Sequence, residues 1–240
     1  MSGHSRWAKL KHFKGALDAK KSAIFTKFGH GITVAARQGG GDPETNFRLR
    51  LAIEQARRAN LPKENIERAI KRGTGGLGGE EVEEIFYEVI GPSNIAIVVE
   101  ALTDNKNRTI SNLRRILNRY GFSLGQKNSV LWMFERYGIL RITNFTRITN
   151  LEDLELKLIE AGIEDIKKEN GELTIYTKPG DLQKIKEAVE RDGTQVDYAG
   201  IEWFAKNPIQ IDEGTQKKVD ALFAELDEDP DINDYYSNIE

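Results

Sequence analysis

The sequence predicts an α+β protein, with an N-terminal three-helix domain followed by two α/β domains of ferredoxin-like type. Residues 18–72 place apolar side chains at three- and four-residue steps, which is typical of helices. Residues 138–204 show the order strand, helix, strand, strand, helix, strand, which is that of the split βαβ unit. Residues 85–134 show only part of such a layer. We therefore expect the end of the chain to complete the middle domain and the last domain to be inserted into it.

A glycine-rich segment, residues 73–79, separates the helical region from the strand-rich region and predicts the first boundary. The expected domains are residues 1–79 (basic arm, helical domain and linker), residues 80–134 with 207–240 (discontinuous α/β domain) and residues 135–206 (inserted ferredoxin-like α/β domain).

Charge is distributed unevenly along the chain. Residues 1–72 hold sixteen Lys and Arg against six Asp and Glu, whereas residues 73–240 hold nineteen against thirty-two. A cationic end on an acidic body is the pattern of a protein that contacts polyanions, so we expect a nucleic-acid partner.

The chain has no Cys, which excludes disulfides, thiolate zinc sites and a Cys nucleophile. It has no signal-peptide core or membrane-length apolar run, so we expect a cytoplasmic protein without a membrane partner.

The N-terminal domain is expected to begin with a basic arm, residues 1–17. Trp7 within the arm either stacks on a base or sugar or packs back on the helices, and the sequence leaves both open. A first helix is expected over residues 18–37. Asp42 and Pro43 predict the N-cap and first position of a second helix that runs to about Asn60. A short third helix should follow Pro62.

The middle domain should open with a hairpin and a helix. Its expected elements are strands 85–90 and 95–102, helix 107–120, a buried strand 130–134, a strand 209–211 and helix 213–226. The acidic tail, residues 227–231, is expected to be solvated, with the capacity to compete with nucleic acid for the basic lobe. Its spacing does not fit a calcium loop, because Ile232 falls where Gly is needed and Asn238 where Glu is needed.

The inserted domain should contain strand 139–142, helix 151–161, a hairpin of strands 164–168 and 172–177, helix 181–191 and a last strand within 194–204. The dipeptide at 170–171, Asn-Gly, is a strong hairpin signal.

Catalytic motifs are missing from the sequence. There is no HExxH, GxSxG or Walker motif, and we expect no enzyme, no cofactor and no metal. Gly73, Gly75 and Gly78 match GxGxxG formally, but a helix precedes them and an acidic run follows, so we reject a dinucleotide site.

Basic residues of the first domain are the candidate phosphate contacts, and a helix of the middle domain carries a possible second patch. The first set is Arg6, Trp7, Lys9, Lys11, Lys14, Lys20, Lys21, Lys27, Arg37, Arg48, Arg50, Arg57, Arg58, Arg68, Lys71 and Arg72. The second set is Lys106, Arg108, Arg114, Arg115 and Arg119. Solvated helix faces are the alternative interpretation of the second set.

Motifs along the whole chain resemble those of the YebC/PmpR family, which includes the mitochondrial translational activator of cytochrome c oxidase subunit I. They are GHSRW at 3–7, DAKK at 18–21, IFTK at 24–27, ITVAAR at 32–37, GGGDP at 39–43, RLRLAI at 48–53, PKENIERAI at 62–70, EALTDNKNRT at 100–109 and WMFER at 132–136. The resemblance implies three domains and a non-enzymatic regulator of gene expression. Bacterial members are described as DNA-binding transcriptional regulators, whereas the mitochondrial relative points to the ribosome and to translation.

Two kinds of target stay open on the residues alone. No helix carries several base-reading side chains in a helix-turn-helix frame, which favours recognition of shape and phosphate, in structured RNA such as ribosomal RNA as well as in DNA. No dimerisation zipper is evident, and we expect a monomer. The alternative from another class is a protein-interaction adaptor without nucleic-acid contact.

Overall fold

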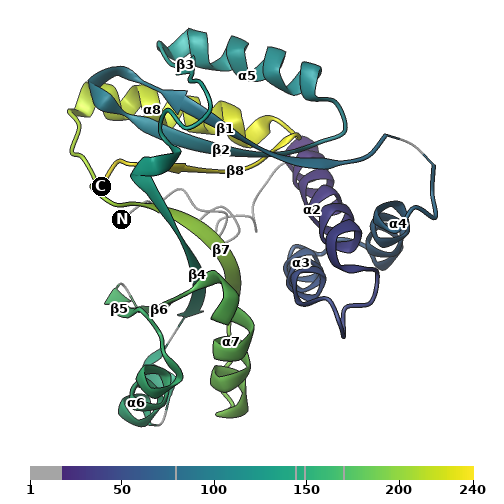
Figure 1. Cartoon of the computed structure of the whole chain (residues 1–240), viewed down its shortest axis with the longest axis vertical. Coiled ribbons are helices and arrows are strands. Elements are labelled where there is room, and N and C mark those ends of the chain that lie inside the picture. Colours follow the sequence, from purple (N-terminus) through teal and green to yellow (C-terminus); the bar gives the residue numbers. More distant parts are fainter. Residues whose placement is uncertain (1–17, 79, 144, 149, 170) are drawn as a thin grey trace. The chain divides into compact units, whose positions relative to one another are not determined.

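The computed structural model describes residues 18–240 apart from 79, 144, 149 and 170 (Figure 1). The chain divides into two compact units, Met1–Phe134 with Ala205–Glu240, and Glu135–Phe204. Helices combine with two antiparallel sheets, which confirms the α+β class. The finer division of the first unit into a helical and a sheet domain stays a prediction. Among the described residues, no helix has both the length and the apolar character needed to cross a membrane.

Three helices form what we call the helical lobe: α2 (Asp18–Gly39), α3 (Phe47–Arg58) and α4 (Lys63–Gly73). Their apolar faces meet in one core that includes Phe28, Ile32 and Leu49. The helices pack closely at Gly73, where a β-carbon would lie 2.3 Å from the carbonyl oxygen of Thr33. Only glycine fits there, because any side chain would push α4 away from α2.

The expected start of α3 at Asp42 is wrong, since the N-cap is Asn46. The Asn46 side chain accepts a hydrogen bond from the Leu49 amide (3.0 Å) and donates to the carbonyls of Ala35 and Gly40 (2.8 Å each). Asp42 instead accepts the Glu44 amide in a turn. Asn46 ties the end of α2 to the start of α3, a tertiary link that a local capping signature cannot show.

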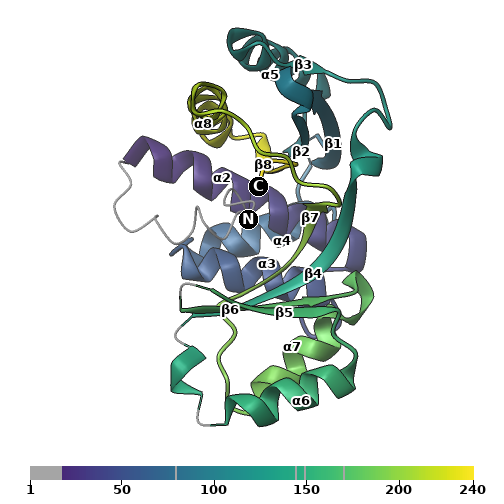
Figure 2. The ribbon, with the colours of Figure 1, turned by 90° about the vertical axis from the view of Figure 1, so that its left-hand side faces the viewer.

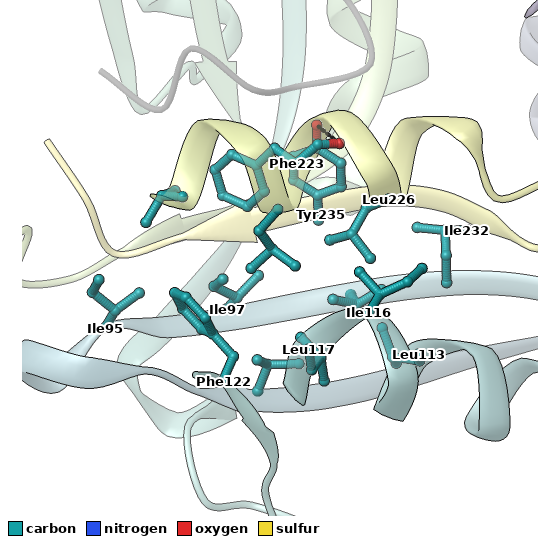
Figure 3. Close-up of a cluster of buried hydrophobic side chains, with 14 of the residues drawn as sticks. Ile95, Ile97, Leu113, Ile116, Leu117, Phe122, Phe223, Leu226, Ile232 and Tyr235 are labelled. Atoms are coloured by element: carbon teal, nitrogen blue, oxygen red, sulfur yellow. Dashed lines mark hydrogen bonds between the residues drawn. The ribbon is translucent and has the colours of Figure 1, made fainter. Parts of the chain in front are cut away.

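The sheet of the first unit has the strand order β3-β1-β2-β8, and all its pairs are antiparallel. Its strands are β1 (Glu83–Ile90), β2 (Ala96–Thr103), β3 (Ser123–Leu124) and β8 (Ile232–Ser237). Helices α5 (Lys106–Tyr120) and α8 (Glu213–Glu228) close its core, shown in Figure 3. The ring of Phe223 stacks on Tyr235 with centroids 4.4 Å apart, so α8 is held to β8.

Two expected strands of this unit are wrong. Residues 131–133 form a 3-10 turn, and the strand begins only at Phe134. Residues 209–211 form no strand, and only a single bridge joins Ile209 to Ile239. The partner of β2 is instead β8, which follows the acidic tail. The tail is not solvated as expected, because Asp229 and Asp231 are buried.

The second unit has the strand order β5-β6-β4-β7, which is the order of a ferredoxin-like sheet. In chain order its elements are β4 (Phe134–Thr143), α6 (Leu151–Ala161), β5 (Asp165–Glu169), β6 (Glu172–Thr177), α7 (Leu182–Arg191) and β7 (Tyr198–Ala205). Both helices lie on one side of the sheet (Figure 2). The hairpin expected at 170–171 is present, with Gly171 at φ +77°. A buried bidentate ion pair joins Arg141 to Glu202 at 2.6 and 2.7 Å.

Candidate nucleic-acid interface

The first candidates lie in the arm, outside the described residues: Arg6, Trp7, Lys9, Lys11 and Lys14. Lys20 and Lys21 lie in the first turn of α2, but their side chains are also outside the described part. The structure therefore tests the interface only from residue 22 onward.

Four cationic side chains of the helical lobe contact the sheet portion of the first unit. Lys27 is 9% exposed and donates from Nζ to the carbonyl of Asp227 at 2.7 Å. Arg72 pairs with Asp104 at 3.2 Å and also donates to the Glu80 carbonyl. The other two ion pairs are Arg37 with Glu81 and Arg48 with Glu84. These cations hold the lobe against the sheet portion. Because their donor groups are occupied by these contacts, they are less available to bind an external phosphate.

His30 lies buried in the same contact. Its Nδ1 is 2.8 Å from the carbonyl oxygen of Leu102, and a small apolar cluster of Val34, Val82 and Leu102 lies alongside. Burial lowers the pKa of the imidazole, and the Leu102 carbonyl offsets this only in part. The ring is therefore neutral at neutral pH, and Nδ1 carries the hydrogen that it donates. His30 is a docking residue rather than a phosphate contact.

A different set of lobe cations faces solvent. Arg57, Arg68 and Lys71 are exposed, and no hydrogen bond or ion pair to another described residue is seen for them. Arg58 is exposed as well, and Arg50 lies over the ring of Phe47 at 5.5 Å. Guanidinium groups on a helix surface match the geometry of phosphate oxygens. The end of α3 and the outer face of α4 thus form the most open cationic surface of the described lobe.

A groove of about 610 Å³ runs between α2 and α4. Its lining includes Phe25, Thr26, His30, Asn65, Arg68 and Arg72. The Thr26 hydroxyl donates to the Ser22 carbonyl, and Arg72 is paired with Asp104, so the Asn65 amide and the Arg68 guanidinium are the donors left beside the Phe25 ring. An amide and a guanidinium beside an aromatic ring suit a phosphate together with a sugar or base. Sequence reasoning named the two arginines but not Asn65 or Thr26, because helical spacing alone does not show which faces of two helices meet.

The second patch on α5 is largely neutralised. Lys106 pairs with Glu83 at 2.8 Å, and Arg119 pairs with Glu225. Of this patch, only Arg114 and Arg115 are exposed without an ion pair among the described residues. The hydrogen bond from Tyr120, followed by Arg119 and then Arg115, lowers the pKa of the Glu225 carboxyl. The acids that pair with Lys106 and Arg119 lie on β1 and α8.

Arg108 is the most strongly held member of that patch. It donates to both carboxylate oxygens of Asp231 (2.7 and 3.1 Å) and to Asp104 (3.0 Å), and Thr109 donates to Asp231 at 2.8 Å. The hydrogen bond to Asp231 raises the pKa of the guanidinium. Asp231 is 2% exposed on its side chain. No sequence signal links two residues so far apart, so this structural role was missed.

Among the residues that the structure describes, no three His, Asp or Glu side chains lie close enough together to hold a metal ion.

The fold and the lobe define an α+β protein that combines a cationic helical lobe with two antiparallel four-stranded sheets. A family model described as TACO1/YebC protein N-terminal domain matches residues 5–76, and one described as TACO1/YebC second and third domain matches residues 82–239. The chain belongs to the TACO1/YebC family.

Relatives match along the whole chain. A protein of Caldanaerobacter subterraneus subsp. tengcongensis, named a probable transcriptional regulatory protein, is 48% identical and covers 100% of this chain and 98% of its own. One of Pseudothermotoga lettingae with the same description is 49% identical and covers 100% and 94%. The crystal structure of a conserved hypothetical protein from Aquifex aeolicus has a TM-score of 0.86 at 43% identity and covers 98% and 97%.

Proposed function

We propose that this chain is a non-enzymatic, nucleic-acid-binding regulator of gene expression that contacts phosphate through its N-terminal lobe. The observation that carries the proposal is the exposed cationic surface of Arg57, Arg68 and Lys71, which the acidic body leaves unneutralised among the described residues. The names of the relatives, probable transcriptional regulatory proteins, support a regulatory role. The basic arm, residues 1–17, adds to the same end of the chain.

The test is the salt dependence of binding. A protein that neutralises duplex phosphates loses about 0.9 log units of affinity per log unit of salt for each contact. Replacing Arg57, Arg68 and Lys71 together by Ala should weaken binding to a labelled duplex and lower this slope by roughly 2 to 3. Fluorescence anisotropy over a salt series measures both quantities.

A matched control removes the same charge elsewhere. Lys178, Lys217 and Lys218 are exposed, and changing all three to Ala should leave the slope as in the wild type. Equal losses in both triple variants would show that only net charge matters and would contradict a defined lobe interface. A flat salt response of the wild type would overturn the proposal itself.

The physiological target is either DNA, as for a transcriptional regulator, or ribosomal RNA, as for a ribosome-associated translational activator. Crosslinking in growing cells, with DNA and RNA sequenced from one sample, separates the two. Reads on ribosomal RNA identify a translation factor, and reads on a few promoters identify a transcriptional regulator. Enrichment of neither would support the adaptor alternative, in which the chain binds only protein.

A further inference from the structure

A surface loop of the first unit, residues 125–133, is fixed by a buried acid. Glu88 on β1 is 7% exposed, and its carboxylate accepts backbone N–H groups of Val130 (2.7 Å), Leu131 (2.8 Å) and Asn128. Burial by itself would raise the pKa of this carboxyl, but those amide hydrogen bonds hold it below the usual value. Three amides on one carboxylate tie the backbone of residues 128–131 to β1.

The fixed loop presents Trp132 to solvent. The side chain is 66% exposed, the largest exposed fraction among the big apolar side chains described. Its Nε1 donates to the Ser129 carbonyl at 3.0 Å, and its own carbonyl accepts from Lys206 Nζ at 3.0 Å. The indole edge is thus occupied and held by the loop itself. Burying such a ring would be strongly favourable, so a rigid and exposed Trp indicates a partner that covers it.

The surroundings of Trp132 show what kind of partner fits. Residues 121–134 contain Lys127 and no Asp or Glu, and Glu135 and Arg136, which follow, carry opposite charges. Lys206 supplies a second positive charge. Ile90 is 43% exposed at the end of β1, and its Cδ1 lies 3.3 Å from where a β-carbon on Gly125 would be. We call Trp132, Ile90, Lys127 and Lys206 the Trp132 patch. It is cationic and aromatic on a body of net negative charge.

We propose that the Trp132 patch binds an unpaired nucleobase, with Trp132 stacking on the base and Lys127 and Lys206 contacting the adjoining phosphates. A planar ring attached to negative charge complements both features of the patch. Every base has a π-face, so this contact would distinguish single-stranded from paired segments rather than one sequence from another. The inference rests on the proposed function in that the chain must bind nucleic acid, and it adds a contact outside the helical lobe.

The test uses the full chain and two labelled RNAs, a hairpin with a single-stranded tail and the same hairpin without it. Trp132→Ala should weaken binding to the tailed hairpin by about fivefold to 150-fold, since base stacking contributes about 1–3 kcal/mol. Binding to the blunt hairpin should stay unchanged, and Trp132→Phe should keep most of the affinity for the tail. Leu156→Ala, which truncates a side chain 61% exposed on α6, is the matched control.

Each outcome decides between the two proposals. If Trp132→Ala leaves tail binding intact while the lobe triple variant weakens it, the base-stacking site is overturned and the lobe interface stands. If Trp132→Ala weakens binding to both RNAs equally, the patch does not bind an unpaired base. The same holds if the variant loses binding to a protein partner while its affinity for both RNAs is unchanged. If the wild type binds neither RNA, the base-stacking site is overturned, while the proposed function is decided separately by the salt series on the duplex.

Discussion

At the scale of single residues, several acids of this protein are buried and hydrogen-bonded, although the composition suggests only surface charge. Sequence reasoning treated the tail as solvated charge, yet Asp231 is buried and bonded to Arg108 and Thr109. Glu88 shows the same principle in a loop, where a carboxylate replaces missing backbone partners. A composition count cannot separate such acids from exposed ones, because the difference lies in contacts with residues far away in sequence.

Asp231→Asn should destabilise the first unit by about 1–3 kcal/mol, since it weakens charged hydrogen bonds to Arg108 at a buried position. Urea denaturation measures the change. Glu213→Gln, which breaks an exposed pair with Lys217, is the control and should stay within about 0.5 kcal/mol of the wild type. Equal effects of the two changes would show that the Asp231 contacts do not stabilise the fold.

The lowered pKa of Glu88 predicts how the stability of the first unit changes with pH. Its folded pKa is depressed, so the stability that it contributes is present above the unfolded carboxyl pKa of about 4.3 and is lost as pH falls through the folded value. Glu88→Gln should therefore be less stable than the wild type at neutral pH. The difference in free energy of unfolding between the two proteins should become smaller below about pH 4. Urea midpoints over a pH series test this, and a gap that widens in acid would contradict it.

At the scale of elements, local patterns predicted most helices and both hairpins closely. Helix 151–161 is found with those bounds, because its apolar spacing and the following Gly162 in the left-handed region are local signals. Segment 130–134 was misjudged because Glu88, forty-two residues earlier in the chain, bends it into a turn. Strand β8 was missed because polar residues such as Asn233 and Asp234 interrupt its apolar pattern and yet are buried.

The start of α3 gives a test of which cap the protein uses. Asn46→Ala should cost about 1–2 kcal/mol, because it removes the N-cap and the two bonds to the end of α2. Asp42→Ala removes only a turn contact and should cost less than about 0.5 kcal/mol. Thermal unfolding of both variants measures the difference, and a larger loss for Asp42→Ala would restore the cap that the sequence predicted.

At the scale of the whole molecule, the charge asymmetry seen in the sequence was informative but incomplete. It identified the cationic end, yet the structure divides those cations into Lys27, Arg37, Arg48 and Arg72, which hold the lobe in place, and Arg57, Arg68 and Lys71, which face outward. The sequence alone does not predict the Trp132 patch, although Trp132 lies in the WMFER motif at 132–136 that resembles the family. Neither distinction follows from composition, since both depend on which surfaces meet.

The pairing of β8 with β2 bears on how the chain folds as it is made. The two strands are far apart in sequence, so a nascent chain that stops before residue 232 has β1 and β2 but no partner for the outer edge of β2. The strands of the second unit, in contrast, have all been synthesised by residue 205. The inserted segment can therefore acquire its sheet while the unit around it is still open. Premature termination upstream of β8 would leave β2 as an apolar edge strand, the kind of edge that recruits other chains into aggregates.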